Sequence, residues 1–511
     1  MLRTELIRTV PELLARHAAE RPDRVAFRDD RRAVTYADLA DRTARLAGYL
    51  QVLGLQQGER ALLYLDNAVE TAEAYLAVPR AGAIAVCANP GAAVPEVAHI
   101  LDDSGARIVI TDAAHLDVVR RLVAGRDGFL AVVVTGDAPG LAAPEVSYDA
   151  LVAGAAVAPR DCLGLDDVAW MLYTSGTTGR PKGVYLTQRG CFWVVASWTP
   201  VVGMGPDDVV LSPLPLFHSY ALVVCVLGIL ALGASERILT RFSVDEVREH
   251  LRTDEYTVFP GVPTMFHYLL DRAGAAGLGA PRLRVCVSAG AILPAALNSD
   301  FERAFGVPLL DGYGITETST FVTMNGPEGT RVMGSCGLPL PGLSVRLVDP
   351  ATGRDVLPGE EGELWVQGAG VTPGYHNLPE ATAAVLVDGW YRTGDLARRD
   401  EHGYLRISGR TKELIIRGGE NIYPAEVEDA LLACESVADA AVVGAPHDSL
   451  GEVPVAFVVA REGGLDREKV LEVCGERLSS FKVPDELIEV DSIPRTGSGK
   501  ILRFQLQQRL G

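Results

Sequence analysis

The sequence predicts an α/β protein with a large N-terminal domain of parallel α/β sheets and a small α+β C-terminal domain. Strand-like and helix-like segments alternate to about residue 340, which is typical of a parallel sheet. From about residue 335 the strands become short and are separated by Gly, Pro and Asp, which indicates a small antiparallel β-barrel-like or sheet subdomain. A chain of 511 residues is also too long for a single hydrophobic core.

The N-terminal domain is expected to span residues 1–410 and to begin with an amphipathic helix over residues 1–23. Thr35 and Asp38 form a capping-box pattern that opens a second helix. The uncharged run 220–234 is too short to cross a bilayer and is interpreted as a buried helix. Buried strands are expected where β-branched runs end in turn residues, at 61–66, 107–112, 129–136, 257–263 and 284–290.

The later strands follow the same logic in two further blocks. The antiparallel block covers about residues 335–410, with strands at 344–349, 362–368 and 403–408. The C-terminal domain covers residues 411–511, with strands at 437–445 and 453–460 and a helix at 466–480. The boundary is placed at 408–413, where glycine and charged residues interrupt the apolar pattern.

Composition excludes several classes of protein. The formal net charge of -19 argues against nucleic acid as a partner, because a phosphate backbone would be repelled. The 8 cysteines form no CxxC pair, which argues against a zinc site or a disulfide scaffold and fits a reducing compartment. The N-terminus lacks the apolar run of a signal peptide and the C-terminus is not a peroxisomal address. We therefore expect a cytoplasmic protein with no membrane span.

Lysine is rare in this chain, with 5 among the 47 lysines and arginines. A position that keeps lysine against this bias suggests a need for a compact ammonium group. Lys469 lies on an ordinary amphipathic helix pattern. The other four lie in or beside Gly- and Pro-rich stretches and are Lys182, Lys412, Lys482 and Lys500.

The stretch YTSGTTGRPKGV, residues 173–184, follows an apolar strand and has the chemistry of a polyphosphate site. Glycines let the backbone approach a ligand, hydroxyls donate, and Lys182 adds a mobile positive charge. It is not a Walker A loop, because the Gly-Lys order and the following Ser/Thr are absent. The candidate phosphate-binding residues are Thr174, Ser175, Gly176, Thr177, Thr178, Gly179 and Lys182.

Three further stretches contain ligand-type side chains. In DGYGITET, residues 311–318, Tyr313 offers an aromatic face, Thr316 a hydroxyl and Glu317 a hard oxygen ligand for magnesium. Asp395, in a turn, can accept from two ribose hydroxyls, and Lys500 is flanked by glycine near the C-terminus. Each is weak alone, since Gly-Tyr-Gly turns and solvated loop lysines are common.

Together these stretches resemble the signature motifs of the acyl-adenylate-forming superfamily, which includes acyl- and aryl-CoA synthetases, luciferases and peptide-synthetase adenylation domains. The matching segments, from about residue 10 to the end, are YTSGTTGRPKGV, GYGITET, GWYRTGDL, GRTKELIIRGGENIYPAEVE and PRTGSGKILR, with LPLFHSYAL and GSCGLPLPG as lesser matches. The resemblance implies an N-terminal domain of three subdomains and a small mobile C-terminal domain with its hinge at Lys412.

The resemblance also implies a two-step reaction, in which a carboxylic acid and ATP form acyl-AMP and a thiol then takes the acyl group. Coenzyme A, ATP and Mg²⁺ are the implied cofactors and co-substrates. Lys500 would bridge the carboxylate and the α-phosphate, Thr316 would hold the α-phosphate and Glu317 the magnesium ion. Tyr313 would stack on adenine. The other implied nucleotide or CoA contacts are Gly290, Ala291, Asp311, Gly312, Gly314, Asp395, Arg410, Lys412, Gly418 and Gly419.

The resemblance also restricts the kind of carboxylic acid that is expected as the substrate. Phe217, His218 and Ser219 include no acidic partner for an α-ammonium group, and Gly312 stands where malonate-activating members carry arginine. A hydrophobic monocarboxylic acid of aryl, cyclic or medium-chain type is expected, in a setting such as specialised metabolism. His218 resembles a pocket-gating, catalytic residue, although simple packing also explains it. The other expected pocket residues are Tyr220, Ala221, Gly261, Ala289, Gly312 and Gly314.

Coenzyme A is the expected acceptor, and a discrete acyl carrier protein is the alternative. A non-catalytic nucleotide- or acyl-AMP-binding regulator is disfavoured, because Lys500, Glu317 and Asp395 are all present. A monomer and a homodimer both stay open.

Overall fold

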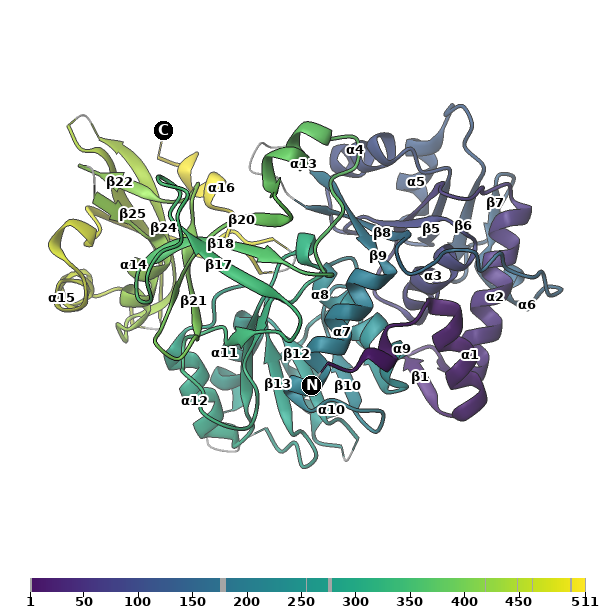
Figure 1. Cartoon of the computed structure of the whole chain (residues 1–511), viewed down its shortest axis with the longest axis horizontal. Coiled ribbons are helices and arrows are strands. Elements are labelled where there is room, and N and C mark those ends of the chain that lie inside the picture. The colour runs from purple at the N-terminus through teal and green to yellow at the C-terminus, as the bar shows by residue number, and fades with distance from the viewer. Residues whose placement is uncertain are drawn as a thin grey trace.

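The computed structural model describes residues 2–174, 181–253, 255–273, 278–418, 420–447, 449–461, 463–496 and 499–510. Four sheets organise this part of the chain. The elements after residue 415 gather at one end of the molecule, far from the strands of the first sheet at the other end (Figure 1).

The first sheet has seven strands in the order β7-β6-β5-β3-β4-β8-β9. All neighbours are parallel except β8 and β9. The strands are β3 (Arg60–Tyr64), β4 (Ile84–Cys87), β5 (Ile108–Asp112), β6 (Ala131–Thr135), β7 (Glu145–Ser147), β8 (Val168–Thr174) and β9 (Lys182–Thr187). The connecting helices are α3 (Val69–Arg80), α4 (Val94–Ser104), α5 (Leu116–Val123) and α6 (Tyr148–Ala153).

The second sheet has nine strands in the order β16-β15-β14-β13-β12-β10-β11-β1-β2. Its strands are β1 (Val25–Arg28), β2 (Ala33–Thr35), β10 (Val209–Ser212), β11 (Ser235–Ile238), β12 (Val258–Gly261), β13 (Val285–Ser288), β14 (Leu309–Tyr313), β15 (Thr323–Met324) and β16 (Leu338–Pro339). The central neighbours from β1 to β14 are parallel. One hydrophobic core cluster contains residues of both large sheets.

Helices of this region lie between and around the two sheets (Figure 1). They are α1 (Val10–Glu20), α2 (Tyr36–Val52), α7 (Gln188–Val202), α8 (Ser219–Ala221), η2 (Leu222–Leu227), α9 (Gly228–Leu232), α10 (Val244–Leu251), α11 (Pro263–Ala273) and α12 (Ala295–Phe305). The run from α8 to α9 is buried throughout, which confirms the buried helix expected there. No helix in the described ranges is both long enough and apolar enough to cross a bilayer.

The third sheet is antiparallel, in the order β17-β18-β20-β19 with β21 beside β20. It consists of β17 (Ser344–Val348), β18 (Glu361–Gln367), β19 (Leu386–Val387), β20 (Trp390–Arg399) and β21 (Leu405–Arg410). The short helix η4 (Thr316–Thr318) precedes this sheet in the sequence, and α13 (Pro379–Val385) lies between β18 and β19.

The fourth sheet uses only residues from 415 onward, and so do two separate core clusters. Its order is β23-β22-β25-β24, with β26 parallel to β25. The elements are β22 (Ile415–Arg417), β23 (Glu420–Ile422), α14 (Pro424–Leu432), β24 (Val437–His447), β25 (Gly451–Ala460), α15 (Arg467–Arg477), η5 (Ser480–Lys482), β26 (Glu486–Glu489) and α16 (Arg503–Gln507).

The predicted α/β class, with a large N-terminal part on parallel sheets and a smaller C-terminal part, is confirmed. The helix predicted over residues 1–23 begins later than expected, so the predicted starting residue was wrong. The chain forms a 3-10 turn at Thr4–Leu6, and α1 begins only at Val10. Glu12 accepts a hydrogen bond from the Thr9 backbone N–H at 2.8 Å, and this capping box, with Pro11 in the first turn, sets the beginning of the helix.

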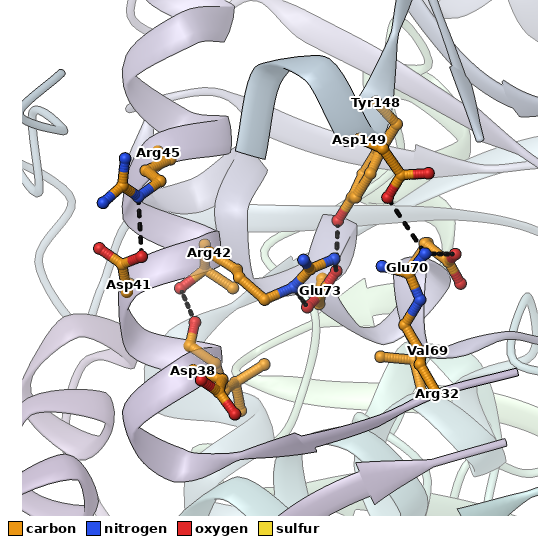
Figure 2. A network of polar contacts seen from close by, with 12 residues as sticks. Arg32, Asp38, Asp41, Arg42, Arg45, Val69, Glu70, Glu73, Tyr148 and Asp149 are labelled. Atoms are coloured by element: carbon orange, nitrogen blue, oxygen red, sulfur yellow. Dashed lines mark hydrogen bonds and ion pairs between the residues drawn. The ribbon is translucent and has the colours of Figure 1, made fainter. Parts of the chain in front are cut away.

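A network of buried ion pairs holds α3 against its neighbours (Figure 2). Glu70 and Glu73 of α3 are fully buried. Arg42 of α2 pairs with both oxygens of Glu73, and the Tyr148 hydroxyl donates to Glu73 Oε2 at 2.7 Å. Arg32 lies 3.2 Å from Glu70. A carboxylate in this setting is tolerable only while its partners remain.

We expect Arg42→Ala to destabilise the protein by about 3–5 kcal/mol, because it leaves the buried Glu73 charge without its cation. The matched control is Arg16→Ala, which removes the exposed i,i+4 pair with Glu20 and should cost less than about 1 kcal/mol. Chemical denaturation followed by fluorescence measures both. Equal effects of the two variants would contradict the role of the network.

Candidate active site

The carboxyl ends of four neighbouring parallel strands meet at one edge of the nine-stranded sheet, where ligands of α/β proteins usually bind. The loops after β10, β12, β13 and β14 line two adjoining cavities there. The first is lined by His218, Ser219, Tyr220, Ala289, Gly290, Gly314, Ile315, Thr316, Thr320, Phe321 and Lys500. The second is lined by Leu214, Pro215, His218, Tyr220, Ala221, Val262, Met265 and Gly290.

The turn after β14 is folded tightly against itself. A Cβ atom at Gly314 would lie 1.3 Å from the carbonyl oxygen of Thr320, so no side chain fits there. Thr320 itself has a φ of 93°, a strained value for a β-branched residue. Thr316 Oγ1 lies 3.2 Å from Ser219 Oγ, and Thr320 Oγ1 donates to the Ser219 carbonyl at 2.8 Å. These contacts hold the Thr316 hydroxyl at the wall of the first cavity.

Asp395 joins two other predicted nucleotide contacts. The hydroxyl of Tyr313 donates to Asp395 Oδ2, and Arg410 Nε lies 2.9 Å from Asp395 Oδ1. The β20–β21 register places Asp395 opposite Arg410. The Asp395 carboxylate raises the pKa of Arg410, and burial together with Asp395 raises the pKa of Tyr313. Each carboxylate oxygen keeps a lone pair for a ribose hydroxyl.

Asp311, on β14 just before Tyr313, offers an unfilled acceptor. Burial raises the pKa of its carboxyl group well above the usual range. Its Oδ1 atom is buried and has no hydrogen-bond partner within the described ranges. A buried polar atom without a partner is costly unless a ligand supplies one. An amino group on a base beside Tyr313 fits this position.

Glu317 belongs to a second polar chain that the sequence did not reveal. The Tyr375 hydroxyl donates to Glu317 Oε1 at 3.0 Å and lies 3.0 Å from the hydroxyl of Tyr391. Lys182 Nζ lies 5.5 Å from the centre of the Tyr375 ring. Tyr375 therefore links the lysine of the phosphate motif to the predicted magnesium ligand. The free lone pairs of Glu317 fit a hard cation such as Mg²⁺.

Lys500 reaches the first cavity on a braced loop of the C-terminal region. Arg495 Nη2 donates to both oxygens of Asp439, at 2.8 and 3.0 Å, and Arg495 Nη1 donates to the Gly499 carbonyl at 3.0 Å. The Thr496 backbone N–H donates to the Lys500 carbonyl at 2.7 Å. A Cβ at Gly499 would touch Val262 at 3.4 Å, so the loop lies close against the end of β12.

A second arginine fixes the chain after the lysine. Arg503 Nε donates to Glu413 at 3.0 Å, and Arg503 Nη2 donates to Glu428 at 3.1 Å. Glu413 follows directly on the predicted hinge residue Lys412. Neither Arg495 nor Arg503 was among the predicted site residues, although both lie in the matched C-terminal motif.

Charge in the two cavities is concentrated on one cation. Desolvation, with Arg410 nearby, lowers the pKa of Lys500 below its usual value. Desolvation, with Lys500 nearby, lowers the pKa of His218 to about 3, so this imidazole is neutral at physiological pH. His218 Nδ1 accepts the backbone N–H of Tyr220 at 3.2 Å, which caps α8.

Some predicted residues are not brought to the described cavities. A Cβ at Gly261 would meet the Phe266 ring at 3.0 Å, and one at Gly312 would meet Met324 at 2.6 Å, so both glycines pack against side chains instead. Ala291, Lys412 and Gly418 line neither cavity. Ser175, Gly176, Thr177, Thr178, Gly179 and Gly419 lie outside the described residues. The roles given to all of these residues stay predictions.

Comparisons with known proteins identify the family of this chain. Residues 14–376 match the family described as AMP-binding enzyme, and residues 426–500 match the AMP-binding enzyme C-terminal domain. Feruloyl-CoA synthase of an Amycolatopsis species is 37% identical over 499 residues, which are 97% of this chain and 98% of that protein. Chalcone synthase cfoA of Aspergillus candidus is 37% identical over 526 residues, 99% of this chain, but the chain spans only 19% of its length.

A similar solved structure is that of ATP-bound MatB from Rhodopseudomonas palustris. Its sequence is 32% identical to this chain, the TM-score is 0.89, and the alignment covers 98% of each of the two chains.

We expect the affinity for ATP to fall as the pH rises through the lowered pKa of Lys500. The ammonium is charged below this pKa and attracts phosphate, whereas the neutral amine above it does not. Calorimetric titration with ATP across neutral to alkaline pH measures this, and Lys500→Arg should flatten the profile because guanidinium stays charged. An affinity that stays level up to the ordinary lysine pKa of about 10.4 would contradict the assignment.

Proposed function

Since the chain belongs to the AMP-binding enzyme family, we propose that it is an AMP-forming acid–CoA ligase. In the first step a carboxylic acid and ATP form acyl-AMP and pyrophosphate. In the second step the thiol of coenzyme A takes the acyl group and AMP leaves. The observation that carries the proposal is that Lys500, Thr316 and His218 line one cavity, beside the Asp395–Arg410–Tyr313 group.

The geometry suits the first step. A carboxylate oxygen of the acid attacks the α-phosphorus of ATP, and the bond from that phosphorus to the pyrophosphate oxygen breaks. Lys500 and the Thr316 hydroxyl are positioned to offset negative charge on the α-phosphate oxygens. Glu317, held by Tyr375, would bind a Mg²⁺ ion that supplies charge neutralisation for the departing pyrophosphate. Asp395 and Arg410 would orient the ribose.

The proposed acid is a hydrophobic monocarboxylate of aryl, cyclic or medium-chain type. Tyr220, Ala289 and Phe321 line the first cavity, and Ala221 and Met265 line the second. Lys500 is the sole charged side chain among the residues that line them, so a second carboxylate on the acid would have no cation of its own. The relative named feruloyl-CoA synthase supports an aryl acid.

The second step is proposed to need a rotation of residues 411–511 about Lys412, which withdraws Lys500 and brings Gly418 and Gly419 to the thiol path. The partners of Arg495 and Arg503 support this division, because Asp439, Glu413 and Glu428 all follow residue 411.

Coenzyme A is the proposed acceptor, and an acyl carrier protein is the alternative. The cytoplasmic location stays a prediction, and monomer and homodimer stay open.

The proposed function predicts acid-dependent pyrophosphate release from ATP. We expect release with aryl, cyclic and medium-chain acids in a panel that also contains amino acids and dicarboxylates, with acyl-CoA detected only when CoA is added. Lys500→Ala should lower the adenylation rate at least about a hundredfold, because it removes a charge used in the transition state. Lys469→Ala, at an exposed helix position, is the matched control. No release with any acid would refute the proposal.

The acceptor step predicts a different phenotype for Gly419→Leu. We expect acyl-AMP and pyrophosphate to form at near the normal rate while acyl-CoA formation is lost, since the side chain would block the thiol path. The two products are separated by chromatography in single-turnover reactions. The complementary behaviour is expected of Lys500→Ala, which should still convert supplied acyl-AMP to acyl-CoA. Normal acyl-CoA formation by Gly419→Leu would show that the two-conformation account is wrong.

A further inference from the structure

We propose that Asn67 is a positioning residue for the acid pocket, acting from the seven-stranded sheet on the loop that carries His218. Asn67 lies between β3 and α3, outside every motif matched above. The loop it holds, residues 214–218, follows β10 of the other large sheet. The proposal rests on the proposed function and adds a residue that shapes how the acid is bound.

The Asn67 amide group binds three backbone groups at once. Its Oδ1 accepts the N–H of Leu216 at 2.8 Å, and its Nδ2 donates to the carbonyls of Leu214 at 2.8 Å and Leu239 at 3.1 Å. A single planar amide is well suited to this, because it carries an acceptor and two donors in fixed geometry.

Tyr75 of α3 completes the hold on Leu216. Its hydroxyl donates to the Leu216 carbonyl at 2.7 Å. Both backbone polar groups of Leu216 are therefore bound by side chains of the seven-stranded sheet region. The Leu214 and Leu216 side chains are buried, so the loop is held from both its polar and its apolar sides.

The held loop forms one wall of the acid pocket. Pro215, between the two leucines, lines the second cavity, and its carbonyl accepts the His218 backbone N–H at 3.0 Å. His218 lines both cavities. Among the predicted nucleotide contacts, Tyr313, Asp395 and Arg410 come from other segments, β14, β20 and β21. A displaced loop would therefore alter the acid site more directly than the contacts to the base and the ribose.

Asn67 is itself held by its neighbours. The backbone N–H of Asp66 donates to Asp112 Oδ2 at 2.9 Å, and Asp112 Oδ1 lies 2.7 Å from His115 Nδ1. Thr71 Oγ1 donates to the Asp66 carbonyl at 2.6 Å. The ends of β3 and β5 and the start of α3 thus fix the turn, so the amide meets the loop in one orientation.

The test compares Asn67→Ala and Asn67→Asp with the wild type. We expect kcat/KM for the acid to fall at least about tenfold in both, because small displacements of a binding wall are costly. The KM for ATP should change less than about twofold. Asn67→Asp has nearly the same shape but cannot donate, so a similar loss there assigns the effect to the hydrogen bonds. Tyr36→Phe is the matched control, since it also removes buried hydroxyl hydrogen bonds to backbone carbonyls, those of Ile229 and Ala234, which lie outside the loop.

Hydrogen exchange supplies a readout that needs no activity. In the absence of substrates, the backbone amides of the loop, residues 214–218, should exchange faster in Asn67→Ala than in the wild type. Their exchange should be unchanged in Tyr36→Phe. If Asn67→Ala fails to fold, Tyr75→Phe can replace it, because it removes one hydrogen bond to the same loop. It should change the same measurements in the same direction, by a smaller amount. Unchanged exchange in the loop, or equal rises in KM for acid and ATP, would overturn the proposal. If the loop exchanges faster in Asn67→Ala but the wild type shows no ligase activity, only the proposed function is overturned.

Discussion

The carboxylate of Asp395 connects the parts of the fold on which the site depends. It lies on the antiparallel sheet, receives the Tyr313 hydroxyl from the end of the nine-stranded sheet, and pairs with Arg410 at the end of β21. A carboxylate that is 3% exposed needs such partners, because desolvation without them is unfavourable. The contact that joins two sheets is also the one proposed to hold the ribose.

The electrostatic character of the cavities follows from what is left unmatched around this contact. Asp311 presents a buried acceptor without a partner in the described part of the chain, and Lys500 presents a desolvated ammonium. His218, which lines both cavities, stays neutral. The protein thus presents one buried acceptor and one desolvated cation, which a molecule with an amino-substituted ring and an anionic tail would satisfy together.

Much of the fold was predictable, because continuous apolar or β-branched runs that end in turn residues mark β3, β5 and β13, and a capping box marks the start of α2. The glycine-rich motifs could also be recognised in the sequence. The structure explains one of their glycines, because Gly314 has no room for a side chain. What could not be predicted is pairing across long separations. Tyr375 meets Glu317 58 residues away, and Asn67 meets Leu216 149 residues away. Tyr375 and Asn67 lie outside the quoted motifs, so only the packing of separate sheets reveals these pairs.

The braces of the lysine loop have a consequence for how this chain can change over evolutionary time. Asp439, Glu413 and Glu428, which hold Arg495 and Arg503, all belong to the same segment as Lys500, whereas the cavity walls belong to the loops of the nine-stranded sheet. Substitutions in the walls leave the ion pairs of Arg495 and Arg503 intact. The support of the lysine loop and most of the cavity wall are thus encoded in separate stretches of the gene, so the wall can change while these ion pairs are kept.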